Sequence, residues 1–206
     1  MIQKFTQDFL ILWATIDPIG TLAVFVAVTA GMTATERRRI ALKASFYSSV
    51  ILLASVILGQ IILTAMGVRL ISLQVAGGII LFLFGLQMVF GKSFKDESAH
   101  GEEGHDIAVF PLAVPSIASP GAIMAAIITT DNTVYSIPTQ IFTAALMLGV
   151  LGATCLGMIY SSTIFKVLGK NGASILIRVM GMLLSALSVE LVMKALGISG
   201  WMTGSR

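Results

Sequence analysis

Two short polar stretches interrupt long apolar segments and carry the residue types best suited to chemistry. They are residues 15–21, TIDPIGT, and residues 117–122, IASPGA. In each, a short polar side chain, Asp17 or Ser119, directly precedes a proline. This order is typical of a helix start, because the side chain accepts from backbone N–H groups and proline lacks an N–H that would otherwise go unpaired. Proline inside a helix breaks it, so we expect new half-helices to begin at Pro18 and Pro120.

The predicted half-helix starts could bind a small charged ligand. Helix N-termini present N–H groups and a positive dipole end, which suit a carboxylate. Asp17 is the only acid near the middle of an apolar segment, where a charge costs about 2.5–3.5 kcal/mol on insertion scales. It either caps its half-helix only, or also meets a substrate ammonium or a coupling cation. The predicted substrate-binding residues are Thr15, Asp17, Pro18, Gly20, Thr21, Ser116, Ser119, Pro120, Gly121 and Ala122.

A zwitterionic amino acid matches this set of groups better than other small solutes. A sugar would favour aromatic platforms, and a lone anion would favour Arg or Lys. We expect H⁺ or Na⁺ as the coupling ion, with the choice left open, and no cofactor and no metal. His100 and His105 flank a Gly-Glu-Glu-Gly stretch, but a metal site needs more convergent ligands, so they are interpreted as solvated loop residues.

The composition identifies the class of protein that positions these residues. Of 206 residues, 56% are hydrophobic and 11% are charged, whereas a soluble domain carries about 25% charged residues. The chain is therefore expected to be a multi-pass protein of the lipid bilayer. Its net charge of +3 is interpreted as a topology signal, not as a nucleic-acid footprint. The single cysteine, Cys155, lies in an apolar run and is interpreted as a packing residue.

The apolar segments predict an all-α integral membrane protein with six transmembrane helices, because a span needs about 20 mostly apolar residues. A Thr33-to-Glu36 capping box begins the second helix and Pro138 begins the fifth. The only clearly hydrophilic loop is 92–106, which separates a first three-helix unit, 1–91, from a second, 107–206. The expected spans are about 5–30, 34–68, 70–91, 107–130, 138–165 and 174–199.

Lysine and arginine positions predict the orientation. Nine of the thirteen Lys and Arg residues follow spans one, three and five, and four lie on the opposite side. Cytoplasmic loops carry the excess of Lys and Arg. We therefore expect loop 92–106 in the cytoplasm and both termini outside. The first span is not expected to be a cleaved signal peptide, since it carries Asp17-Pro18 and no clear small-residue cleavage site.

The two units repeat at a nearly constant spacing. Pro18 and Pro120 are 102 residues apart, while Gln87 and Glu190 are 103 apart, as are Gly78 and Gly181. Each unit has three spans, an odd number, so the second enters the membrane from the other side. The sequence thus predicts an inverted 3+3 repeat with helices 1 and 4 broken, which is a transporter architecture.

Three polar residues of spans three and six have two open interpretations. Glu190 and Lys194 are four residues apart on one helix face, so they either form an ion pair near the outer end or act in gating or coupling with Gln87. A stripe of small residues on span five, Gly149, Ala153 and Gly157, predicts a close helix contact.

Two other classes of protein fit the sequence less well than a transporter. An intramembrane enzyme is disfavoured, because both histidines fall in the loop and Asp17 has no second aspartate at the centre. A structural scaffold leaves the paired half-helix starts unexplained. An exporter or channel for another small solute remains the alternative to an amino acid transporter, and oligomeric state is left open, a homo-oligomer included.

The chain resembles the MarC family over essentially its whole length. The resemblance lies in Asp17-Pro18-Ile19-Gly20 with the following ERRR at 36–39, in AGGIILF at 76–82, and in PLAVP at 111–115 with SPGAI at 119–123. It implies a six-span protein of the bacterial or archaeal inner membrane, related to the lysine exporter superfamily. It also implies transport of small neutral amino acids of the alanine, serine, threonine and glycine class.

Overall fold

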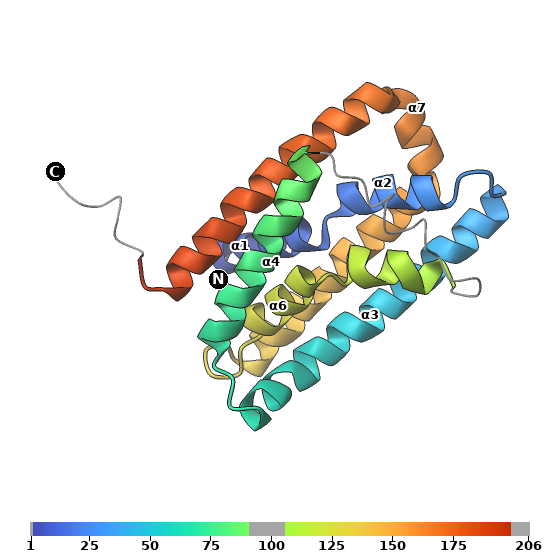
Figure 1. The fold of residues 1–206 in the computed structure, drawn as a ribbon. Coiled ribbons are helices and arrows are strands. Elements are labelled where there is room, and N and C mark those ends of the chain that lie inside the picture. Colours follow the sequence, from blue (N-terminus) through green and yellow to red (C-terminus); the bar gives the residue numbers. More distant parts are fainter. Residues whose placement is uncertain (1, 91–105, 199–206) are drawn as a thin grey trace.

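The computed structural model describes residues 2–90 and 106–198, and every element in these ranges is a helix (Figure 1). The elements fall into four groups along the chain. They are α1 (Ile2–Ile16) and α2 (Pro18–Val28), α3 (Ala34–Ala65) and α4 (Leu70–Phe90), η1 (Ala108–Ile117) and α6 (Pro120–Thr129), and α7 (Ile137–Ala195).

Five of the helical segments are long and apolar enough to cross a membrane, and a bent pair makes a sixth. The five are Gln3–Val28, Ala34–Ala65, Leu70–Phe90, Ile137–Ile164 and Ser174–Ala195, and the pair η1–α6 bends by 53°. The predicted multi-pass all-α architecture is therefore confirmed. Figure 1 shows α7 turning back on itself between its two spans.

Local sequence explains where several helices begin. Thr33 caps α3 by accepting from the Glu36 N–H, while the Glu36 side chain accepts from the Thr33 N–H, so the predicted capping box is confirmed. Pro138 lies in the first turn of α7, as predicted. In η1, Phe110 and Val114 have extended backbones because each precedes a proline, which disfavours the helical conformation of the residue before it.

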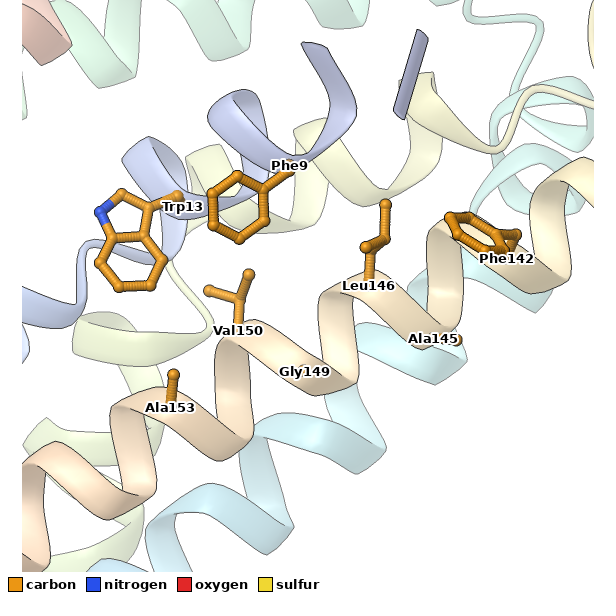
Figure 2. A pocket seen from close by; sticks show the side chains of 8 residues that line it. All are labelled: Phe9, Trp13, Phe142, Ala145, Leu146, Gly149, Val150 and Ala153. Carbon is orange, nitrogen blue, oxygen red and sulfur yellow. The ribbon is translucent and has the colours of Figure 1, made fainter. Parts of the chain in front are cut away.

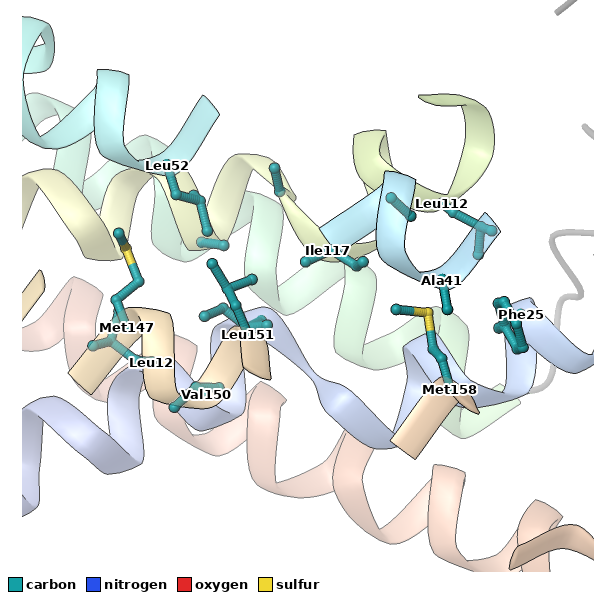
Figure 3. Close-up of a cluster of buried hydrophobic side chains, with 14 of the residues drawn as sticks. Leu12, Phe25, Ala41, Leu52, Leu112, Ile117, Met147, Val150, Leu151 and Met158 are labelled. Carbon is teal, nitrogen blue, oxygen red and sulfur yellow. The ribbon is translucent and has the colours of Figure 1, made fainter. Parts of the chain in front are cut away.

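The hydrophobic core packs around the broken helices. Leu12 and Ile16 of α1 and Phe25 of α2 are fully buried against η1, α3 and the first span of α7 (Figure 3). A second cluster joins α4 and α6 to the last span of α7, and comprises Leu81, Met88, Met124, Leu184 and Leu191. The breaks at Asp17 and Ser119 thus lie inside the bundle, where non-helical backbone is tolerated at membrane depth.

Candidate functional site

The first break is built around Asp17, which separates α1 from α2. Its backbone is left-handed, with φ 48°, and it is the only non-glycine residue with positive φ in the described ranges. Its Oδ1 accepts from the Gly20 N–H at 3.0 Å, while Pro18 begins α2. The predicted cap is therefore confirmed. Asp tolerates the left-handed region better than most residues, because its short polar side chain bonds locally.

The second carboxylate oxygen of Asp17 is buried without a partner. Asp17 is 3% exposed, and its Oδ2 has no hydrogen-bond partner among the described residues. A Cβ added at Gly20 would collide with this oxygen, so Gly20 leaves the carboxylate its space. A buried polar oxygen without a hydrogen bond is costly, and this one lies at the break itself.

The second break is built around Ser119, which caps α6 in the usual extended conformation. Ser119 Oγ accepts from the Ala122 N–H at 3.0 Å and donates to the Thr15 carbonyl at 3.1 Å. The second bond joins the two breaks directly, although Ser119 and Thr15 are 104 residues apart in the chain. The start of α6 therefore lies against the end of α1, and the two breaks are neighbours inside the bundle.

A second polar contact ties the breaks together. Ser116 Oγ donates to Thr21 Oγ1 at 3.2 Å, and Thr21 Oγ1 lies 3.5 Å from the Ile16 carbonyl, to which it donates. Thr15 instead turns its hydroxyl to the Ile11 carbonyl, at 2.8 Å. Of the predicted hydroxyls, those of Thr21 and Ser116 thus bond to each other, whereas the hydroxyl of Ser119 bonds to the Thr15 carbonyl.

The starts of α2 and α6 add backbone N–H donors at the two breaks. The first amides of a helix have no acceptor within it, and proline has no N–H. In α2 and α6 this leaves Ile19 and Gly121, the residues after Pro18 and Pro120, as the first amides without an intrahelical acceptor. The open face of Gly121 meets Leu81 of α4, so Leu81 takes up the space that the sequence predicted for a ligand there.

The three predicted gating or coupling residues lie elsewhere. Gln87 on α4 and Glu190 and Lys194 on α7 are exposed side chains of the outer helices. The ion pairs of the described residues are Lys4–Asp8 and Lys43–Asp106, so the interpretation of Glu190 and Lys194 as an ion pair is not supported, and the gating or coupling interpretation stays a prediction. His100 and His105 fall in 91–105, outside the described residues.

Sequence reasoning missed a buried cluster at the start of α1. Lys4 Nζ pairs with Asp8 Oδ2, lies 3.4 Å from the Thr129 carbonyl, and stands 3.8 Å from the centre of the Tyr135 ring. Thr143 of α7 donates its hydroxyl to Asp8 at 2.8 Å. The spacing of Lys4 and Asp8, four residues on one helix, was a signal, whereas nothing in the sequence marked Thr143.

A second missed contact lies near the start of α3. Arg37 donates from its guanidinium to Ser161 Oγ of α7 at 2.8 Å, with the guanidinium carbon 5.5 Å from the centre of the Phe25 ring. Nearby, Lys43 donates to Asp106 at 2.6 Å, and this hydrogen bond holds the pKa of the Asp106 carboxyl below its usual range. The Lys43–Asp106 pair is exposed.

An apolar groove of about 270 Å³ runs along the first span of α7, beside α1 (Figure 2). Phe9 and Trp13 of α1 form one side, and α7 forms the other with Phe142, Ala145, Leu146, Gly149, Val150 and Ala153. Gly149 and Ala153 are therefore exposed in the groove, and only Gly157 of the predicted stripe faces a helix, at Leu22. The expected close contact along the whole stripe is wrong.

Comparison with known proteins agrees with the fold. A model of the MarC family integral membrane proteins matches residues 2–202. The UPF0056 membrane protein of Aquifex aeolicus is 35% identical over 93% of this chain and 92% of its own length. The UPF0056 membrane protein YvbG of Bacillus subtilis is 34% identical over 93% of each chain, and YhcE of Escherichia coli is 31% identical over 95% and 92%.

No solved structure is significantly similar to the chain. The names of these relatives describe a membrane protein and state no substrate. The match along nearly the whole chain and the multi-pass helical architecture lead to the same assignment. The chain belongs to the MarC family of integral membrane proteins.

Proposed function

We propose that this protein is a secondary transporter of small neutral amino acids, of the alanine, serine, threonine and glycine class, in the inner membrane. The observation that carries the proposal is the hydrogen bond from Ser119 to the Thr15 carbonyl, which joins the N-cap of α6 to the end of α1, two residues before Asp17 and its unpaired oxygen. Half-helices that meet near the midplane are where transporters of several folds hold their substrates.

The chemistry of the breaks fits a zwitterion. Each helix N-terminus favours an anionic group by roughly 0.3–1 kcal/mol when exposed and by up to ~2 kcal/mol when partly buried. The amide of Ile19 would receive the substrate carboxylate, and Asp17 Oδ2 would receive its ammonium. The hydroxyls of Thr21 and Ser116 would exchange their mutual bond for bonds to the ligand. The surrounding burial favours small side chains.

The packing of α4 against α7 supports an inverted repeat. A Cβ added at Gly78 would lie 3.1 Å from the Ser188 carbonyl oxygen, and one added at Gly181 would lie 2.7 Å from that of Gly85. Gly78 and Gly181 are 103 residues apart, and so are Gly85 and Ser188. A two-fold axis relates contacts in this reciprocal way, and small residues allow the close approach.

Transport can be measured with purified protein in liposomes. We expect saturable accumulation of labelled alanine, serine or glycine, driven by an imposed H⁺ or Na⁺ gradient, and no accumulation of a sugar or urea. Asp17→Asn should abolish accumulation, whereas the matched change Asp106→Asn, at an exposed ion pair, should preserve it. Passive flux of every solute would favour a channel, and outward pumping of another solute would favour an exporter.

Orientation belongs to the same proposal. The Lys and Arg distribution predicts that both termini are outside and that segment 92–106 is in the cytoplasm. A reporter fused after Ser98 should be cytoplasmic and one fused after Arg206 should be external. Finding both reporters on one side of the membrane would contradict the orientation.

A further inference from the structure

The polar groups at the two breaks are closed off from solvent. Asp17 and Thr21 are 3% and 1% exposed, and Ser116 and Ser119 are 7% and 5% exposed. Any solute that reaches these groups therefore requires part of the surrounding protein to move. The contacts most able to control such movement are polar ones that cross between helices, because water can replace them when they separate.

One such set of contacts closes the end of the bundle where α1 begins, and we name it the Asp8 cluster. It comprises Lys4 and Asp8 of α1, Thr143 of α7, the Thr129 carbonyl at the end of α6, and the Tyr135 ring. The cluster binds α1 to both α6 and α7. Asp8 is 4% exposed, so its carboxylate is almost fully withdrawn from water.

The other set closes the opposite end, and we name it the Arg37 cluster. Arg37 of α3 donates to Ser161 of α7 and stands over the Phe25 ring of α2. Ser161 and Phe25 are fully buried. This cluster binds α2, α3 and α7 together beyond the second half of the broken helix.

The two clusters lie on opposite sides of the breaks. Thr143 and Ser161 belong to one span, Ile137–Ile164, and at 1.5 Å per residue they are about 27 Å apart along it. That distance is close to the ~30 Å thickness of the hydrocarbon core. Along the first broken helix, the fully buried Leu12 and Ile16 separate Asp8 from Asp17, and Leu22 and Phe25 separate Asp17 from Arg37.

The free-energy cost of desolvating charged groups makes both clusters suitable as contacts that open and close. A buried ion pair loses much of its Coulombic gain to desolvation, so Lys4–Asp8 is a poor device for stability alone. When α1 moves away from α7, water can hydrate both charges and recover that desolvation energy. The same holds for the Arg37 guanidinium once Ser161 is withdrawn. The interhelical hydrogen bonds of each cluster can therefore be exchanged for bonds to water when the helices separate.

We propose that the Asp8 cluster and the Arg37 cluster are the two gates of the transport path, opened alternately on opposite sides of the membrane. The proposal rests on the proposed function, since a gate requires a path for a solute. The structure has both gates closed around the breaks. Thr143 and Ser161 lie at opposite ends of one span of α7. In the proposed closed gates, α1 binds this span through Thr143 and α3 binds it through Ser161.

The test measures access to the breaks from each side. Cys155, the only cysteine, is replaced by alanine, and Ser116→Cys places a thiol at the breaks. Oriented proteoliposomes are treated with a membrane-impermeant thiol reagent from one side or the other. Thr143→Val, which removes the hydroxyl donor at nearly constant volume, and Asp8→Asn should each raise the labelling rate about tenfold from the side of α1's start only.

For the Arg37 cluster we expect increased labelling from the opposite side of the membrane. Ser161→Ala and Arg37→Met should raise labelling about tenfold from the other side only. Asp106→Asn is the matched control, because it breaks an exposed ion pair outside both clusters, and it should leave both rates unchanged. Parent-like labelling in all four gate variants would overturn the proposal, and so would equal increases from both sides, which indicate general loosening.

Uptake separates this proposal from the proposed function. If the gate variants show one-sided increases in labelling but the protein accumulates no amino acid, the gates are supported and amino acid transport is refuted. Gradient-driven alanine uptake together with unchanged labelling in the gate variants would support amino acid transport and refute the gates. The labelling experiment needs no knowledge of the substrate, so its result stands by itself.

Discussion

Asp17 and Ser119 occupy equivalent places, each one residue before the proline that begins a half-helix, yet their backbones and hydrogen bonds differ. Ser119 has an extended backbone, with φ −67° and ψ 157°, and its hydroxyl both accepts and donates. Asp17 is left-handed, with φ 48°, and one of its oxygens is buried and unpaired. The second break is therefore a relaxed cap, whereas the first keeps an unsatisfied group in a strained setting.

The contrast teaches which break is suited to ligand chemistry. Left-handed non-glycine residues cost of order 1–3 kcal/mol and cluster at functional sites. An ordinary cap such as Ser119 would satisfy the start of α2 without that cost. We infer that Asp17 serves more than capping, and that Ser119 serves to hold the breaks together.

The largest effect is expected from Asp17 itself. Asp17→Asn keeps a capping oxygen and tolerates the left-handed region, so thermal stability in detergent should change little while uptake of labelled alanine falls about tenfold or more. Asp17→Ala should also lower stability, since it loses a cap worth ~1 kcal/mol and loses the short polar side chain that makes the left-handed backbone tolerable at this position. Full uptake by Asp17→Asn would remove the distinction between the breaks.

The two glycines that follow the prolines should separate binding from packing. At Gly20 a Cβ would collide with the Asp17 carboxylate, whereas at Gly121 it would meet the Leu81 side chain. Gly20→Ala should therefore lower uptake with little loss of stability. Gly121→Ala should lower the melting temperature through overpacking, worth roughly 1–3 kcal/mol, with a smaller loss of uptake in the protein that remains folded. Uptake and melting curves on the same preparations decide this, and the opposite pattern would reverse the assignment.

Ser119→Ala should have a moderate effect. It removes the cap of α6 and the bond to Thr15, at a cost of about 1 kcal/mol. Because it removes no charge, uptake should fall by only about threefold. Ser119→Thr, which keeps the hydroxyl, is the control. A loss as large as that of Asp17→Asn would make the two breaks equal in function.

The smallest effect is expected at the contact between Ser116 and Thr21. Ser116→Ala removes one hydroxyl–hydroxyl bond of 3.2 Å, and a typical bond of this kind contributes about 0.5–1.5 kcal/mol. We expect a small shift in melting temperature and a modest rise in the alanine concentration for half-maximal uptake. Thr21→Val removes the other hydroxyl and should match it. A large change in either would show that this bond, and not Asp17, organises the breaks.

Local signals predicted the helix starts well. The caps at Asp17, Ser119 and Thr33 depend on neighbouring residues, so the sequence specifies them directly. The hydrogen bond from Ser119 to the Thr15 carbonyl is different, because it is a long-range contact that no local signal specifies. Left-handed backbone at Asp17 was not predictable, because Asp before proline is compatible with an extended cap.

Contacts between unlike helices were also beyond the sequence. Thr143 and Ser161 are ordinary hydroxyls in an apolar span, and only the packing of α7 brings them to Asp8 and Arg37. The surface positions of Gln87 and Glu190 were unpredictable for the same reason. Periodicity identifies a span, but an all-round apolar helix does not indicate which side faces lipid.

The lengths of α2 and α6 have a consequence for synthesis of the chain. They have 11 and 10 residues, or roughly 15 Å each at 1.5 Å per residue, so neither alone can span a bilayer of ~30 Å. The first three spans are synthesised before Ser116 and Ser119. Until α6 arrives, the Thr15 carbonyl lacks its Ser119 donor and the first break lacks its cover within the bilayer. Biogenesis of the first half therefore passes through an incomplete intermediate, and insertion of η1–α6 is the step that completes it.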